Sequence, residues 1–265
     1  MIRVVFFYLL PIRKNVALSN LDLCFPKKDI KWKKNVIREC YINLGINLFE
    51  FLYLPKLNKE SVKRFFNIDN EELVDKTVKL GKGVFFLSGH FSNWEMTAFG
   101  YPLISGRKLN VIAKIQSNKL INNKINHYRE LTGNKIIEIS ASLREVYTKI
   151  KSKEIVCFLV DQSAHPDYSV YVDFFGKNVA TFKGPAKMAL KFRVELVLGY
   201  GIRTKDFNYK IQIEKIDYSD LEDCNDENTK ELTQRIQKAL ERVIIRHPGQ
   251  WLWLHKRFKH MKEKV

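Results

Sequence analysis

The sequence has no apolar run long enough to cross a membrane. Its N-terminal run, residues 4–10, is seven residues long and is followed by Pro11, whereas a spanning helix needs about 20 residues. The run is also too short for a typical signal peptide and lacks a small-residue cleavage site. We therefore expect residues 4–10 to anchor the chain at a membrane interface rather than to span the bilayer.

Cysteine is scarce, which bears on metal binding and on the redox environment. The four cysteines stand at positions 24, 40, 157 and 224, far apart and without Cys-x2-Cys spacing. This pattern argues against a zinc site and indicates reduced thiols in a cytosolic environment. Because Cys157 lies within an apolar run, we expect it to be buried as a small hydrophobic residue. We predict no metal site in this chain.

Acidic residues are too few to balance the basic ones. Lys and Arg number 46 against 29 Asp and Glu, which gives a net charge of +17. Such a charge implies an acidic partner, which can be nucleic acid, an anionic membrane or an acidic protein. The basic residues are scattered along the chain and no nucleic-acid-binding motif is present, so we do not expect nucleic acid to be the partner. A basic nucleic-acid- or lipid-binding protein without turnover remains the alternative from another class.

The composition is that of a globular protein with one large core. Hydrophobic residues make up 45% and aromatic residues 12% of the chain, which excludes a disordered protein. Strand and helix patterns alternate, which predicts an α/β fold: a single domain with a mostly parallel mixed sheet covered by helices. The predicted strands are residues 84–87, 109–113, 135–139, 155–160, 171–176, 195–203 and 209–216, and the predicted helices are 119–131, 142–151, 181–193 and 226–246.

The N-terminal part has the pattern of two amphipathic helices. Residues 13–25 form the first and end before Pro26; the second carries apolar residues three and four apart. We interpret residues 1–55 as an interfacial, membrane-associating helical segment and residues 56–265 as the α/β domain. The alternative is that both helices pack on the domain. The apolar stripe of the second helix consists of Ile37, Tyr41, Leu44, Leu48 and Leu52.

Residues 83–99 are the stretch around which the chain is organised. A buried parallel strand is predicted at 84–87, followed by a sharp turn at Ser88-Gly89. His90 then lies in the loop at the carboxyl end of the strand, where ligands bind in open α/β sheets. Ser92 or Asn93 is expected to cap the next helix, with Glu95 in its first turn.

His90 and Glu95 are candidates for general-base chemistry. A strand-turn-helix corner allows the imidazole to fold back toward the carboxylate, although the two residues are five apart. A carboxylate that accepts from one ring nitrogen fixes the tautomer and leaves the other nitrogen free to deprotonate a hydroxyl. The alternative is a loop histidine with no role in catalysis and a glutamate that favours the helix N-terminus.

The motif Gly-His-Phe-Ser-Asn-Trp-Glu resembles the His-x4-Asp/Glu block of the lysophospholipid acyltransferase superfamily, and specifically that of the lipid A biosynthesis (late) acyltransferases. Further segments resemble this family in the same order along nearly the whole chain. They are residues 13–26, Arg129, Asp161-Gln162, residues 171–176 with Thr181 and Gly184, and residues 250–259. The Glu-Gly-Thr-Arg type block of the glycerol-phosphate acyltransferases is absent.

The resemblance implies transfer of a fatty acyl chain from an acyl carrier protein thioester to a hydroxyl of a lipid A precursor. It assigns the base to His90 and the carboxylate that orients it to Glu95, with no cofactor beyond the thioester co-substrate. Substrate binding or oxyanion stabilisation would fall to a second group of residues. These are Arg129, Asp161, Gln162 and Asn93.

The resemblance also implies a place and partners for the chain. We expect a monomer at the cytoplasmic face of the bacterial inner membrane, peripheral or monotopic, that meets acyl carrier protein and a lipid acceptor. A lysophospholipid or an aminolipid is the alternative acceptor. The segment with Trp251 and Trp253 can sit at the membrane interface, the two indoles can pack on the core, and both can hold at once. His255 is expected to pack or to bind a headgroup.

Overall fold

The computed structural model describes residues 13–139 and 143–262. The apolar run at 4–10 lies outside these residues, so its interfacial role stays a prediction. No helix within the described residues is long and apolar enough to span a membrane.

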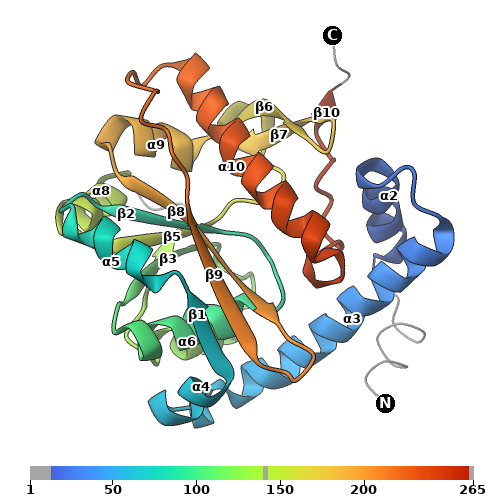
Figure 1. Ribbon diagram of the computed structural model, residues 1–265, viewed down its shortest axis with the longest axis horizontal. Coiled ribbons are helices and arrows are strands. Elements are labelled where there is room, and N and C mark those ends of the chain that lie inside the picture. Colours follow the sequence, from blue (N-terminus) through green and yellow to red (C-terminus); the bar gives the residue numbers. More distant parts are fainter. Residues whose placement is uncertain (1–12, 140–142, 263–265) are drawn as a thin grey trace.

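A seven-stranded sheet forms the centre of the molecule (Figure 1). Its strand order is β1-β9-β8-β2-β5-β3-β4, and every neighbouring pair is parallel except the β8–β9 hairpin. The predicted mostly parallel mixed sheet is therefore confirmed. The bounds are β1 Phe66–Asp69, β2 Val84–Ser88, β3 Leu109–Ala113, β4 Lys135–Glu138, β5 Ile155–Leu159, β8 Glu195–Arg203 and β9 Tyr209–Lys215.

Helices bury both faces of this sheet, because alternate side chains of each strand point to opposite sides. On β2, Phe85 and Leu87 belong to one apolar cluster and Val84 and Phe86 to another. The first cluster includes residues of α8 (Leu143–Lys151), α9 (Gly184–Phe192) and α10 (Asp226–Arg246). The second includes residues of α4 (Lys59–Phe65), α5 (Glu71–Lys79) and α6 (Trp94–Ser105).

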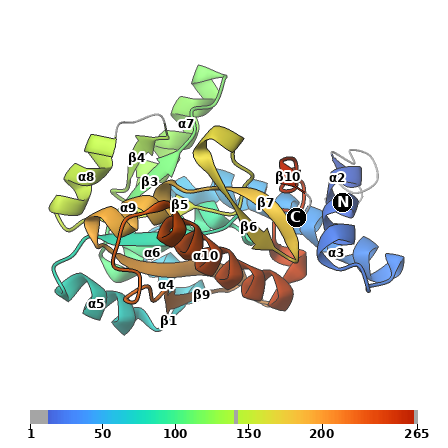
Figure 2. The same ribbon diagram turned by 90° about the horizontal axis from the view of Figure 1, so that it is seen from above.

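A small antiparallel sheet lies toward one end of the molecule (Figure 2). It consists of β6 (Ser169–Phe174), β7 (Lys177–Phe182) and β10 (Met261–Lys262). The predicted helix at 181–193 starts too early, because residues 177–182 pair with β6. The two-residue turn between these strands has positive φ at both positions, 53° at Phe175 and 76° at Gly176, as tight hairpins require.

The N-terminal helices are α2 (Lys14–Cys24) and α3 (Ile30–Tyr53), and they have two different environments. The apolar residues of α2 and of the first half of α3 belong to the same core cluster as the sheet. The second half of α3 instead exposes Leu48, Phe49, Leu52 and Tyr53 by 49–60%. The predicted apolar stripe of this helix is therefore buried at Ile37 and Tyr41 only.

The C-terminal segment packs on the core. Trp251 and Trp253 are 2% and 0% exposed, so of the two interpretations offered for them, core packing is confirmed. The amide of Asn20 on α2 donates to the backbone oxygens of Trp253 and His255. Cys157 is buried as predicted.

Candidate active site

The loop after β2 turns sharply and brings its residues close to the rest of the site. A side chain at Gly89 would place a Cβ 2.8 Å from the ring of Phe91 and 3.3 Å from Cγ of Asp161. Ser92 has a φ of 47°, in the left-handed region. Asn93 caps α6 as predicted, because its side-chain oxygen accepts from the backbone N–H of Met96. This geometry leaves His90 at the carboxyl edge of the sheet.

The carboxylate that holds His90 comes from the neighbouring strand. β2 and β5 are parallel, with Ser88 opposite Leu159, so the residues just beyond them meet at the same edge. There the Nδ1 of His90 lies 2.8 Å from Oδ1 of Asp161. The other carboxylate oxygen accepts from the His90 backbone N–H and from the Trp251 indole, both at 2.8 Å. Asp161 is only 2% exposed.

This pair of residues favours a charged carboxylate and a more basic imidazole. Burial raises the pKa of Asp161, but the His90 charge and three hydrogen bonds outweigh it and lower that pKa to about 2. Burial and the charge of Arg129 lower the pKa of His90. The charge of Asp161, its hydrogen bond to the imidazole and the charge of Glu95 outweigh them and raise that pKa above 6.5. With Nδ1 held by an anion, Nε2 is the nitrogen available as a base.

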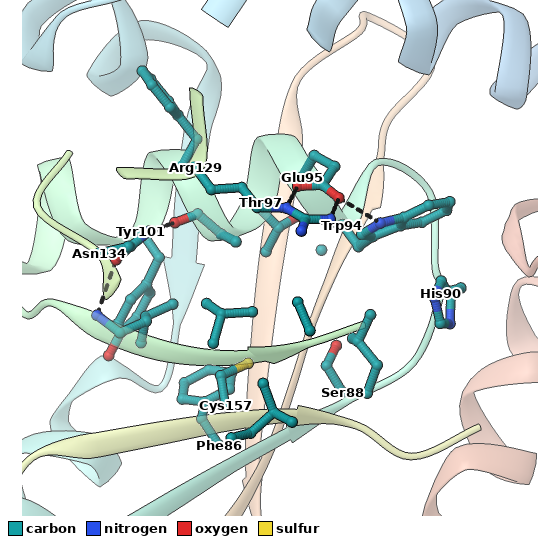
Figure 3. A pocket seen from close by; sticks show the side chains of 18 of the residues that line it. Phe86, Ser88, His90, Trp94, Glu95, Thr97, Tyr101, Arg129, Asn134 and Cys157 are labelled. Carbon is teal, nitrogen blue, oxygen red and sulfur yellow. Dashed lines mark hydrogen bonds and ion pairs between the residues drawn. The ribbon is translucent and has the colours of Figure 1, made fainter. Parts of the chain in front are cut away.

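Glu95 does not make the contact expected of it. Its carboxylate is bound by Arg129, with Nε 2.9 Å from Oε2 and Nη2 2.6 Å from Oε1. The indole of Trp94 also donates to it, and that indole packs edge-on to the His90 ring at 4.8 Å. Figure 3 shows Glu95 directed toward Arg129, with Trp94 between it and His90. The orienting hydrogen bond predicted for Glu95 is thus made by Asp161.

Arg129 lies on α7 (Lys119–Glu130), and its side chain reaches across to Glu95 on α6 (Figure 3). Its side chain is 18% exposed. Burial lowers the pKa of the guanidinium, but the hydrogen bonds and charge of Glu95 raise it overall. The Arg129 cation is thus fixed at the same cavity as His90.

The two remaining predicted site residues have different positions. The amide nitrogen of Gln162 lies 3.3 Å from Nε2 of His90, and both residues line a cavity. Asn93 is 1% exposed and does not line that cavity. Both ends of its side chain are engaged, one by Met96 and the other by Glu50. Its polar atoms therefore serve helix capping and the contact with Glu50, and a substrate contact of Asn93 stays a prediction.

A cavity of about 340 Å³ extends inward from these polar residues between α6 and the sheet. His90, Glu95, Arg129 and Gln162 line its polar end (Figure 3). The remainder is lined mainly by apolar side chains, as is usual for pockets that bind small organic molecules. These include Phe86, Ala98, Phe99, Val111, Ile112, Cys157 and Leu159.

Comparison with known proteins identifies the family. The model of the bacterial lipid A biosynthesis acyltransferases matches residues 3–260 of the sequence. The chain belongs to this family. It is accordingly an acyltransferase that transfers groups other than aminoacyl groups.

The relatives of the chain include acyltransferases named for lipid A biosynthesis and one named for phosphatidylinositol mannoside. The chain is 25% identical to an Escherichia coli (strain K12) lipid A biosynthesis palmitoleoyltransferase over 93% of the chain and 79% of that protein. It is 23% identical to the lipid A biosynthesis lauroyltransferase of the same organism, over 96% of the chain and 81% of that protein. It is also 22% identical to a phosphatidylinositol mannoside acyltransferase of Mycobacterium tuberculosis (strain ATCC 25618 / H37Rv), over 76% of the chain and 63% of that protein.

Two features of this acyltransferase site could not be predicted from the sequence. One is the Asp161–His90 contact, for which the only signal was an aspartate at the end of a buried run. The other is Trp251, whose indole donates to Asp161 from 90 residues away. His255 lies close by, where its Nε2 accepts from the backbone N–H of Ser163.

Proposed function

We propose that this acyltransferase moves a fatty acyl chain from an acyl carrier protein thioester to a hydroxyl of a lipid A precursor. The observation that carries the proposal is the position of His90. Its Nδ1 is fixed by a buried carboxylate, and His90 lines the polar end of a mainly apolar cavity. The proposed base and the proposed binding site for the acyl chain are therefore adjacent, so that an acceptor hydroxyl bound there would lie close to both.

In the proposed reaction His90 acts as a general base and no acyl-enzyme forms. Nε2 takes the proton as the acceptor oxygen attacks the thioester carbonyl, and the carbon–sulfur bond then breaks. The carrier thiolate receives that proton from the imidazolium, and an ester is left on the lipid. Asp161 stabilises the imidazolium while the charge is present.

The developing oxyanion requires hydrogen-bond donors at the mouth of the cavity. The Gln162 amide is one candidate, because its nitrogen lies 3.3 Å from Nε2 of His90. Arg129 is the other, because Glu95 engages only part of its guanidinium. In this proposal Glu95 acts mainly by holding Arg129, and removal of one such donor costs about 10²–10³ in rate.

The donor and the acceptor are inferred from the relatives and from charge. Relatives named for lipid A biosynthesis cover most of the chain, which favours a lipid A precursor as acceptor. A net charge of +17 suits both an acidic carrier protein and an anionic membrane. The apolar cavity provides the place for the acyl chain. These considerations do not choose a chain length.

We also propose that the enzyme works as a monomer bound peripherally at the cytoplasmic face of the inner membrane. The exposed apolar residues at the end of α3 support membrane contact, and a lysine lies beside one of their aromatic rings. Lys56 lies 5.5 Å from the ring of Tyr53. Aromatic rings and lysines together are favoured at membrane interfaces.

The purified protein in detergent, given an acyl carrier protein thioester, tests this function. A Kdo-bearing tetra-acylated lipid A precursor and a lysophospholipid are offered separately, and products are measured by mass spectrometry. We expect a mass gain of one acyl chain on the lipid A precursor that is absent with His90→Ala. A gain on the lysophospholipid alone would move the acceptor to the alternative, and no gain on either would contradict acyl transfer from this donor.

A further inference from the structure

Helix α3 contacts the loop that carries His90 through a cluster of half-buried polar side chains. Asn43, Asn47 and Glu50 occupy one face of the helix, at spacings of four and three residues. All three accept hydrogen bonds from the guanidinium of Arg203, which is 6% exposed at the end of β8. The opposite side of the same stretch is the exposed apolar surface of α3.

Two of these helix residues also form hydrogen bonds with the loop itself. The amide of Asn47 donates to the backbone oxygen of Ser92. Glu50 accepts from the amide of Asn93 at 2.8 Å, and Asn93 caps the helix that bears Glu95. Asn43 differs from both, because its amide donates to the backbone oxygen of Gly249 at 3.0 Å instead.

The loop is held from its other side by the C-terminal segment. The Ser92 N–H donates to the backbone oxygen of Gln250 at 2.6 Å, and the Leu252 N–H donates to that of His90 at 3.1 Å. The Gln250 side chain in turn binds the backbone N–H and oxygen of Arg203, at 2.9 and 2.8 Å. Arg203 therefore joins both supports of the loop, through its side chain to α3 and through its backbone to Gln250.

This support has a reason in the backbone of the loop. A serine with φ in the left-handed region persists only where its surroundings over-determine it. The two residues before Ser92 include His90, whose distance from Asp161 depends on where the loop lies. A displacement of about 1 Å in such a group is enough to cost on the order of 10²-fold in rate.

We propose that Asn47 and Glu50 of α3, organised by Arg203, are positioning residues that hold the loop 89–93 and thereby place His90 against Asp161. Helix α3 is in this view a wall of the active site as well as the support of the exposed apolar residues. The kinetic part of the inference rests on the proposed function, whereas the placement of the His90 ring does not.

Two matched variants of α3 test this inference. Asn47→Asp keeps an oxygen for Arg203 but replaces the N–H that binds Ser92 with a second oxygen, which repels that carbonyl. Asn43→Asp makes the same change of charge, keeps the same contact to Arg203 and loses a donor to Gly249 instead. Three properties are measured for each: kcat and KM for acyl transfer, the thermal midpoint, and the imidazole signals of His90 in a ¹H–¹⁵N spectrum assigned with His90→Ala.

We expect Asn47→Asp to lower kcat about 10-fold or more, with KM within about twofold of the parent value. We expect it also to shift the His90 ring signals. Asn43→Asp should change neither kcat nor the ring signals, although its thermal midpoint should be similar to that of Asn47→Asp. Equal losses of activity that follow the thermal midpoint in both variants would overturn the inference. Unchanged ring signals in Asn47→Asp would overturn it too. Absence of acyl transfer in the parent with a selective ring shift in Asn47→Asp would contradict the proposed function and support the positioning role.

Discussion

The Nδ1 of His90 lies 2.8 Å from Oδ1 of Asp161, a residue 71 positions further along the chain. The contact divides the acidic residues of the site into two groups with separate tasks. Asp161 holds the imidazole of His90, and Glu95 holds the guanidinium of Arg129. Each task leads to a different expected effect of mutation.

Replacement of His90 by alanine removes the proposed base. We expect kcat to fall about 10²–10⁴-fold, the range typical of general-base catalysis. His165→Ala is the control, because that histidine is 65% exposed and pairs with Asp167 away from the cavity. Both variants are assayed with the same thioester and acceptor. A His90→Ala enzyme that retains full activity would exclude this residue as the base.

Asp161→Asn tests the orientation of His90. Asparagine presents an amide where the Nδ1–H and two other donors now find a carboxylate, so the ring loses its fixed tautomer. A comparable change in a serine protease triad costs about 10⁴ in kcat, and we expect a loss of about 10²–10⁴-fold here. Circular dichroism and the thermal midpoint establish that the variant is folded. Parent-like kcat in a folded variant would rule out this role.

The dependence of activity on pH follows from the raised pKa of His90. A base must be neutral, so kcat/KM should rise with pH through a pKa above 6.5. In Asp161→Asn the main cause of the increase is removed while burial still lowers the pKa, so the rise should move to lower pH. Glu95→Gln should move it less, because Glu95 affects His90 through charge alone. An equal movement in both variants would show that the two carboxylates act alike.

Glu95 and Arg129 should behave as a coupled pair in a double-mutant cycle. Glu95→Gln leaves a half-buried guanidinium without its carboxylate, and Arg129→Gln does the reverse. If the function of Glu95 is to hold Arg129, the double variant should lose little more activity than Arg129→Gln alone. Losses in kcat that multiply would instead indicate two independent roles.

The thiols are expected to be irrelevant to turnover. Burial raises the pKa of Cys157 to about 12, and Cys24 and Cys40 are also buried. Only Cys224 is exposed among the four, so iodoacetamide should modify this residue and leave activity intact. Mass spectrometry after digestion locates the label, with Cys224→Ser as the unlabelled control. Rapid inactivation in that control would reveal a reactive thiol elsewhere.

The regular elements could be predicted because their patterns are local. Strand 195–203 and helix 226–246 were predicted with the bounds that the structure shows, since each carries an unbroken apolar period. β1 and β7 were missed. The first has four residues at a sheet edge, and the second was merged with the helix that follows, although Gly184-Pro185 marks the start of that helix. Short segments of this kind are specified by their partners rather than by their own sequence.

The site could be predicted only as far as its residues share a loop or a strand end. The sequence places His90 at the carboxyl edge of the sheet, and the predicted strand 155–160 ends directly before Asp161; both residues do lie at that edge. Which carboxylate meets the imidazole depends on the β2–β5 register and on the direction of the Glu95 side chain. Neither is encoded in a local pattern, and for that reason the contact was assigned to the nearer residue in the chain. The role of Trp251 depends on the same long-range packing.

The indole of Trp251 has a consequence for the order in which the site forms during translation. It supplies one of the three hydrogen bonds to Asp161, and its neighbour Gln250 holds the loop through Ser92. While the chain is being translated, every residue of the base and its carboxylate emerges from the ribosome before these supports exist. The site therefore acquires the geometry described here only after Gln250 and Trp251 have been synthesised and have packed against the loop.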